Sequence, residues 1–225
     1  MRRVWVITAA CVLAGTAVGI APAAPAHAAV DCSRTGPGQL AVERYLAAHP
    51  RYGKVTVDGR QSRADCTAIK RFQVRFGISP AAGYAGTVTK SVANRLRNAA
   101  VSRCRTGTRV CVDLTSQTFW FVRSGQVVLG PTTIRTGRTG GYQTPTGSFA
   151  IGTKKAMTRS TYYGTKMPYW QQFYRDMGLH ETPSYLYQGP GSHGCVNLLR
   201  RDAISLFSLT KTGTPVSIFG RKPGT

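Results

Sequence analysis

The spacing of the apolar residues changes near residue 108, and this change constrains the fold more than any other feature of the chain. Before it, apolar residues recur at helical intervals, as in residues 39–46. After it, short runs of β-branched and aromatic residues alternate with turn residues, as in residues 110–114. The 225 residues are enough for two cores. The sequence therefore predicts two domains, one helical and one mainly β.

Residues 31–98 are expected to form a small α-helical domain of three helices. The first helix covers residues 39–46 and ends before Pro50. Asp65 is expected to cap the second helix, and Thr87 the third.

The turns and helices of this part resemble the peptidoglycan-binding-domain-1 family. That family implies a three-helix bundle that docks on cell-wall peptide. A structural domain that binds nothing is the alternative. The matching segments are Val57-Asp58-Gly59, residues 67–73, Phe76-Gly77-Ile78 and residues 86–89.

After a linker at residues 99–108, residues 109–220 predict a mainly-β domain, like a sandwich or barrel, with few helices. One helix is expected at residues 203–209. Strands are expected at residues 110–114, 118–122, 126–129, 132–136, 147–151 and 215–219.

The first 28 residues have the features of a secretory signal peptide. Arg2 and Arg3 precede an apolar segment at residues 4–20, and Ala26-His27-Ala28 fits the cleavage rule. An uncleaved membrane anchor and a twin-arginine signal are the alternatives. No other apolar run approaches membrane length, so we expect no transmembrane anchor after cleavage.

The charge balance predicts an anionic environment. Lys and Arg number 30 against 8 Asp and Glu, a formal net charge of +22. Export argues against nucleic acid and favours an anionic cell-wall polymer. We therefore expect an extracytoplasmic, cell-wall-associated protein, although the charge could merely maintain solubility.

The cysteine count points to one functional thiol. Cys11 leaves with the signal peptide, and five cysteines, an odd number, remain. Export favours pairing, and any four cysteines allow three connectivities. A free thiol in an exported protein is a hazard unless it has a function. The favoured pairs, each local to one segment, are Cys32–Cys66 and Cys104–Cys111, which leaves Cys195.

Two histidines precede Cys195 in the sequence and favour nucleophilic chemistry. A thiol attacks as the thiolate, and an imidazole such as His180 or His193 can take its proton. In an extended segment His193 and Cys195 face the same way, roughly 7 Å apart. Backbone amides around Gly194 could stabilise an oxyanion. The alternatives are a zinc site formed by these three side chains, which no metal-binding motif supports, and a buried cysteine near incidental histidines.

The segment Ser192-His193-Gly194-Cys195-Val196-Asn197-Leu198, preceded by His180, resembles the signature of the L,D-transpeptidase catalytic domain. The resemblance extends over residues 108–219. Upstream segments that match in the same order are residues 116–120, 144–149 and 167–170.

The resemblance implies a reaction and roles. The nucleophile attacks the third stem residue of a peptidoglycan tetrapeptide, releases D-Ala and forms a thioester, which an amine of an acceptor stem resolves. Carbapenems are expected to acylate the cysteine, and no metal or organic cofactor is needed. The roles are Cys195 as nucleophile, His180 as base, His193 as support for the thiolate, Gly194 and Cys195 as oxyanion donors, Ser192 as backbone support, Asn197 in the substrate pocket, and Tyr169, Trp170 and Tyr162 as a lid.

Glu181 departs from the pattern, because many members have Gly or Ser after the first histidine. Its side chain is expected either to hydrogen-bond an imidazole or to point to solvent. An L,D-carboxypeptidase that uses water and a non-catalytic wall-binding protein remain alternatives. The sequence leaves the acceptor amine, the exact stem peptide and the oligomeric state open.

Overall fold

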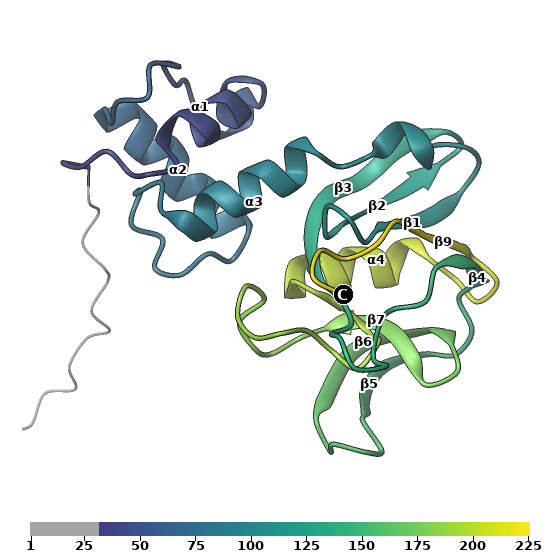
Figure 1. Ribbon diagram of the computed structural model, residues 1–225. Coiled ribbons are helices and arrows are strands. Elements are labelled where there is room, and N and C mark those ends of the chain that lie inside the picture. The colour runs from purple at the N-terminus through teal and green to yellow at the C-terminus, as the bar shows by residue number, and fades with distance from the viewer. Residues whose placement is uncertain (1–31) are drawn as a thin grey trace, which may run out of the picture.

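The computed structural model describes residues 32–225, in which a helical region precedes a β-rich part (Figure 1). The expected signal peptide and Cys11 lie outside the described residues. Within this range, none of the helices combines the length and the apolar character needed to cross a membrane.

The N-terminal region is helical and has its own apolar core, as the sequence predicts. Leu46, Ile69, Phe72 and Phe76 are fully buried within that core. The helical elements are α1 (Gln39–Ala47), η1 (Pro50–Tyr52), α2 (Arg63–Arg75), α3 (Thr87–Arg97) and η2 (Val101–Arg103).

Both expected helix caps are wrong, by three residues for α2 and by one residue for α3. Ser62 caps α2, and Asp65 lies in the first turn, where its carboxylate accepts from the Ser62 N–H in a capping box. Gly86 precedes α3, and no side chain caps this helix. Asp65 is the third residue of the helix, and its side chain reaches back to the cap residue Ser62. An aspartate near the start of a helix suits either position, which is why the sequence suggests Asp65 as the cap.

The β-rich part has nine strands in one sheet, in the order β4-β9-β1-β2-β3-β8-β7-β6-β5. The sheet curves as a half-barrel, and the mainly-β prediction is confirmed. The strands are β1 (Arg109–Asp113), β2 (Thr118–Arg123), β3 (Gln126–Arg135), β4 (Gly147–Ala150), β5 (Lys154–Arg159), β6 (Lys166–Tyr174), β7 (Met177–Glu181), β8 (Val196–Leu198) and β9 (Pro215–Phe219).

One helix, α4 (Arg200–Leu209), packs on the inner face of this sheet. Leu206 of α4 is fully buried in a core with Phe119, Ile134 and Leu179. Residues in the same strands that alternate with these core positions face away from α4. This alternation determines which side chains reach the functional site.

Both expected disulfides are present: Cys32–Cys66 joins the chain before α1 to α2, and Cys104–Cys111 joins η2 to β1. Cys195 is the free cysteine of the described residues. The pairing confirms the prediction made from local spacing.

The helical region contacts the β-rich part through a buried ion pair. The Arg75 guanidinium lies 2.8 Å from the Asp202 carboxylate, which is 1% exposed. The Thr132 hydroxyl donates to the same carboxylate at 2.6 Å. The Tyr187 hydroxyl, on the loop between β7 and β8, donates to the Phe76 carbonyl. These contacts orient the helices against the loop that precedes Cys195.

Candidate active site

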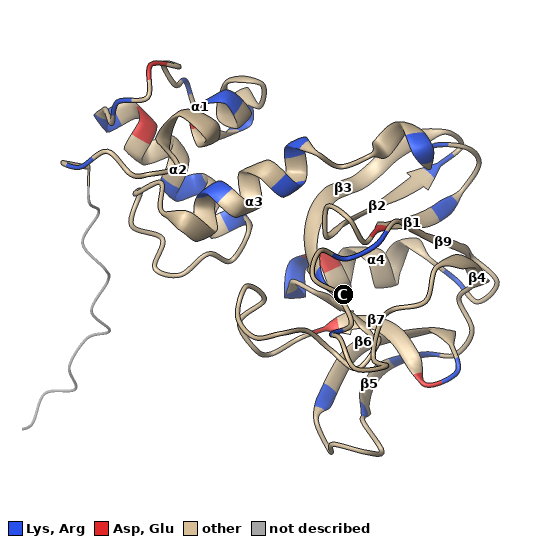
Figure 2. Ribbon diagram, in the orientation of Figure 1, with Lys and Arg blue, Asp and Glu red and all other residues tan. Residues whose placement is uncertain are grey.

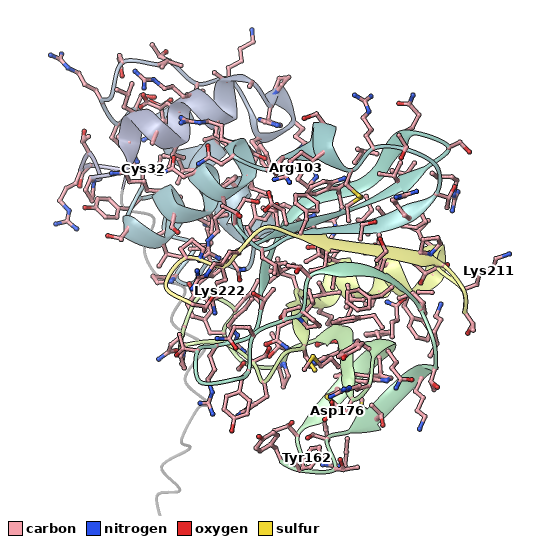
Figure 3. All side chains as sticks on the ribbon, turned by 45° about the vertical axis from the view of Figure 1, so that its right-hand side comes forward. Cys32, Arg103, Tyr162, Asp176, Lys211 and Lys222 are labelled. Atoms are coloured by element: carbon pink, nitrogen blue, oxygen red, sulfur yellow. A yellow bond between two sulfur atoms is a disulfide. The ribbon has the colours of Figure 1, made fainter. Side chains whose placement is uncertain are left out.

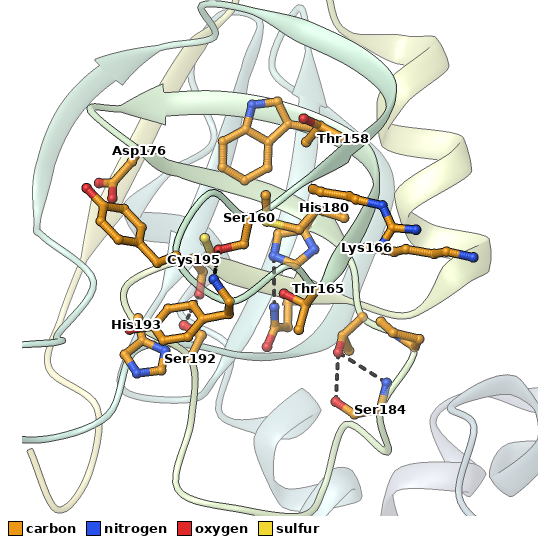
Figure 4. A pocket seen from close by; sticks show the side chains of 18 of the residues that line it. Thr158, Ser160, Thr165, Lys166, Asp176, His180, Ser184, Ser192, His193 and Cys195 are labelled. Carbon is orange, nitrogen blue, oxygen red and sulfur yellow. Dashed lines mark hydrogen bonds between the residues drawn. The ribbon is translucent and has the colours of Figure 1, made fainter.

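A pocket of about 540 Å³ opens on the face of the sheet opposite α4 (Figure 4). The sequence-predicted residues that line it are Cys195, His180, His193, Ser192, Asn197, Trp170 and Tyr162.

Strand pairing brings these residues together. β7 and β8 are parallel neighbours, and His180 is paired in register with Asn197. Their neighbours Leu179 and Val196 point into the core, so His180, Cys195 and Asn197 face the pocket together. Residues 17 positions apart in sequence thus lie side by side.

A chain of hydrogen bonds determines the tautomer of His180. The Arg135 guanidinium donates to Asn197 Oδ1 at 3.1 Å and 3.2 Å, so the Asn197 amide nitrogen faces His180 Nε2 at 3.2 Å. Nε2 therefore accepts, and Nδ1 carries the proton that it donates to the Glu181 carbonyl at 2.7 Å. Arg135 was missed in the sequence because it lies 62 positions from Asn197 and belongs to no local motif.

His180 is neutral at physiological pH. Its side chain is buried, and burial lowers its pKa from 6.5 to about 4, while the hydrogen bond to the Glu181 backbone opposes the shift. The Nε2 electron pair of this neutral imidazole accepts from the Asn197 amide in the resting site, so Nε2 takes a proton only when that hydrogen bond breaks.

The Glu181 side chain has neither of the expected roles. Its carboxylate pairs with Arg200 at 3.3 Å and does not contact the imidazole. The main-chain carbonyl of Glu181 holds His180, and any residue at this position supplies that group. The departure from the family pattern at this position therefore leaves the orientation of the imidazole intact.

The Cys195 thiol is mostly buried, and its environment disfavours the thiolate. Burial, with a smaller contribution from the negative charge of Asp176, raises its pKa from 9.0 to about 11. A hydrogen bond from the Gly178 backbone acts in the opposite direction. The resting pocket thus holds a neutral thiol and a neutral imidazole.

His193 lies at the open side of the pocket in an aromatic and cationic environment. Its Nε2 lies 2.8 Å from the Arg138 guanidinium. Its ring stacks on Tyr163 and meets the edge of Tyr142. Partial burial and the charge of Arg138 lower its pKa. Because arginine only donates, Nε2 accepts, and His193 is also neutral.

The turn from Ser192 to Cys195 is held by its own hydrogen bonds. The Ser192 hydroxyl donates to the Cys195 carbonyl at 2.6 Å and accepts from the Gly194 N–H at 3.2 Å. The Gly194 amide, an expected oxyanion donor, is therefore already engaged. Gly194 has a φ of +108°, and a Cβ there would lie 2.5 Å from Met177 Sδ, so this position requires glycine.

The aromatic residues divide between the two faces of β6. The Trp170 ring lies 5.8 Å from the His180 ring in the pocket. Its neighbour Tyr169 packs against Phe207 of α4 instead. This corrects the expectation that both line the pocket, because adjacent strand residues point to opposite faces.

The tip of the β5–β6 hairpin adds a further aromatic edge to the pocket. Tyr162 is 76% exposed and Tyr163 is 54% exposed, and both line the pocket. Figure 3 shows Tyr162 at the tip of the hairpin. Tyr163 was not singled out in the sequence, although its neighbour Tyr162 was. The exposed rings flank the approach to Cys195.

The described residues contain no group of three or more His, Cys, Asp and Glu side chains arranged to hold a metal. His180, His193 and Cys195 share a pocket without forming such a group, so the zinc alternative has no geometric support.

Comparison with known proteins identifies a family and related solved structures. The model of the YkuD family, the L,D-transpeptidase catalytic domain, matches residues 107–218. A crystal structure of an L,D-transpeptidase from Stackebrandtia nassauensis is 44% identical, with a TM-score of 0.82 over 87% of this chain and 97% of that one. An L,D-transpeptidase from Xylanimonas cellulosilytica is 26% identical, with a TM-score of 0.50 over 82% and 94%. No curated protein matches the sequence significantly.

Proposed function

The chain belongs to the L,D-transpeptidase family, and we propose that it is an exported enzyme that cross-links peptidoglycan through an acyl-enzyme on Cys195. The observation that carries this proposal is the shared pocket, in which the free thiol of Cys195 lies with a buried, neutral His180. His180 Nε2 accepts from the Asn197 amide at rest, and the mechanism requires the thiol proton to replace this hydrogen bond.

The first half-reaction forms a thioester. The Cys195 sulfur attacks the carbonyl carbon of the third stem residue in a donor tetrapeptide, and the thiol proton passes to His180 Nε2. The C–N bond to the terminal D-Ala breaks, and His180 returns the proton to the departing amine. Because the thiol and the imidazole are both neutral at rest, proton transfer accompanies the attack and does not precede it.

The second half-reaction transfers the acyl group. The amine of an acceptor stem attacks the thioester carbonyl, His180 takes the amine proton, and the Cys195 sulfur leaves as it is reprotonated. Arg135 holds the Asn197 amide, and this amide orients the imidazole in the resting site to which each step returns. The Cys195 main-chain amide is our assigned oxyanion donor, since the Gly194 amide donates to Ser192.

The proposal also covers where the enzyme acts and how its helical region attaches it to the cell wall. The signal-like first 28 residues, the two disulfides and the excess of Lys and Arg support export to a cell wall rich in anions. The helical region, which resembles a peptidoglycan-binding unit, would hold the enzyme near its polymer and raise the local substrate concentration.

Intact-mass spectrometry of the protein incubated with a carbapenem tests the nucleophile. We expect a one-to-one adduct that is absent from Cys195→Ala, with both disulfides intact in each sample. An adduct that persists in Cys195→Ala would refute the assignment, and the lack of any adduct would favour a non-catalytic wall-binding protein.

A disaccharide tetrapeptide substrate then distinguishes the acceptors. A cross-linked dimer with released D-Ala is the expected product. A shortened stem alone would show that water is the acceptor and that the enzyme is an L,D-carboxypeptidase.

A further inference from the structure

A second cavity, of about 600 Å³, lies between α3 and the β-rich part, and we call it the interdomain cleft. Its polar lining comes from both sides: Lys90, Asn94 and Arg95 of α3, Ser116 and Gln117 of the β1–β2 turn, and Lys222 near the C-terminus. Figure 3 shows Lys222 where the C-terminal segment approaches the helical region.

The cleft has three cations and no acidic side chain in its lining. Within residues 32–225 the ion pairs are Arg75–Asp202 and Arg200–Glu181, both outside the cleft. Figure 2 shows how few acidic residues the chain has to offset its Lys and Arg residues. The positive charges of the cleft therefore lack a partner of opposite sign.

Arg95 is the cation that best fits a binding role. Its side chain is half-buried, forms no ion pair within residues 32–225 and lies close enough to Tyr187 for the two to interact electrostatically. Burial lowers the pKa of Arg95, and burial together with the charge of Arg95 lowers the pKa of Lys222. A bound anion would favour the charged form of both side chains.

Asp113, whose neighbours Thr115 and Ser116 line the cleft, does not fill this role. Asp113 is 2% exposed, and its oxygens accept from the Ala100, Thr115 and Ser116 main-chain N–H groups and from the Ser116 hydroxyl. It lies behind the cleft wall and is fully engaged there.

Lys222, which lines the cleft, also contacts the backbone next to the catalytic segment. Lys222 Nζ donates to the carbonyls of Thr136, Gly137 and Pro190, and the Ser192 N–H donates to the same Thr136 carbonyl. The side of the cleft near Lys222 is therefore two hydrogen bonds from the turn that carries Cys195.

We propose that the interdomain cleft binds an oxyanion, a phosphate or a carboxylate, carried on an extended cell-wall polymer. The guanidinium of Arg95 and the ammonium of Lys90 supply charge, and the Asn94 amide supplies a neutral donor. The polymer's identity rests on the proposed function, which places the chain at the wall, whereas the anion preference rests on the cleft alone.

Isothermal titration calorimetry at fixed ionic strength tests the cleft with two probes: a glycerol phosphate oligomer, and an oligogalacturonate of matched length. We expect saturable binding of at least one probe, and the preferred probe shows whether phosphate or carboxylate is the natural group. The Cys195→Ala variant should bind equally well. The absence of saturable binding of either probe overturns the proposal.

Three variants locate the site. Arg95→Gln should weaken binding at least tenfold, and Lys90→Gln, an exposed change that spares folding, should weaken it several-fold. Arg97→Gln is the matched control, because it removes the same charge from an exposed position of α3 outside the cleft lining. If Arg97→Gln weakens binding as much as Arg95→Gln, the charge acts diffusely and the proposed site is wrong.

The carbapenem adduct provides an independent readout. An enzyme that forms the adduct but binds neither probe refutes the cleft and keeps the proposed function. A protein that binds a probe in the cleft but never reacts at Cys195 supports the cleft and refutes the proposed function.

Discussion

The neutral resting state of Cys195 makes a quantitative prediction about its reactivity. Burial and Asp176 raise its thiol pKa from 9.0 to about 11. A shift of two units lowers the thiolate fraction at pH 8 by roughly 100-fold, equivalent to about 2.7 kcal/mol. Alkylation by iodoacetamide should therefore be slow in the folded protein, and its rate should rise about tenfold per pH unit from pH 6.5 to 9.5 without a plateau.

Intact-mass spectrometry at timed intervals measures this rate. The same chain unfolded in urea without reductant, which leaves Cys195 as the reactive thiol of the described chain, is the reference and should level off above pH 9. Asp176→Asn should lower the Cys195 pKa because it removes a nearby negative charge, whereas Asp58→Asn, in the helical region, should not. A rate that levels off below pH 8 in the folded protein would show a pre-formed thiolate and refute the neutral-pair mechanism.

Further expectations follow from the same contacts. Because His180 has a folded pKa of about 4 against 6.5 unfolded, the unfolded chain binds the extra proton as the pH falls through this window. The free energy of unfolding should therefore decrease by up to about 3 kcal/mol from pH 6.5 to 4, measured by urea titration, and His180→Gln should remove this component. Arg75→Ala leaves a buried carboxylate unpaired and should cost roughly 3–5 kcal/mol, against less than about 0.5 kcal/mol for the exposed Lys70→Ala in the same helix. Gly194→Ala should abolish carbapenem acylation while a cooperative thermal transition remains; full acylation would contradict the steric argument.

Much of this protein follows from local patterns in its sequence. Helical and strand spacing predict the switch in architecture near residue 108, because each type of element repeats its apolar residues at its own interval. Proximity along the chain predicts both disulfides. The segment from Ser192 to Leu198 identifies the family because its turn is held by hydrogen bonds within the segment itself, so its residues follow one another in the sequence.

The side-chain partners in the site depend on the tertiary structure. Arg135 and Arg138 reach Asn197 and His193 across 62 and 55 positions, and no local pattern records such contacts. The engagement of the Gly194 amide and the pairing of the Glu181 carboxylate with Arg200 likewise depend on how the strands and α4 meet.

Tyr169 and Trp170 show why the sequence alone does not determine which side chains line the pocket. The sequence marks both as aromatic, but the curvature of the sheet and the position of α4 decide which face is core and which is pocket. The interdomain cleft exists only because α3 and the C-terminal segment approach each other in space. Spacing along the chain determines the type of each element, whereas packing between distant elements determines the environment, and hence the chemistry, of each side chain.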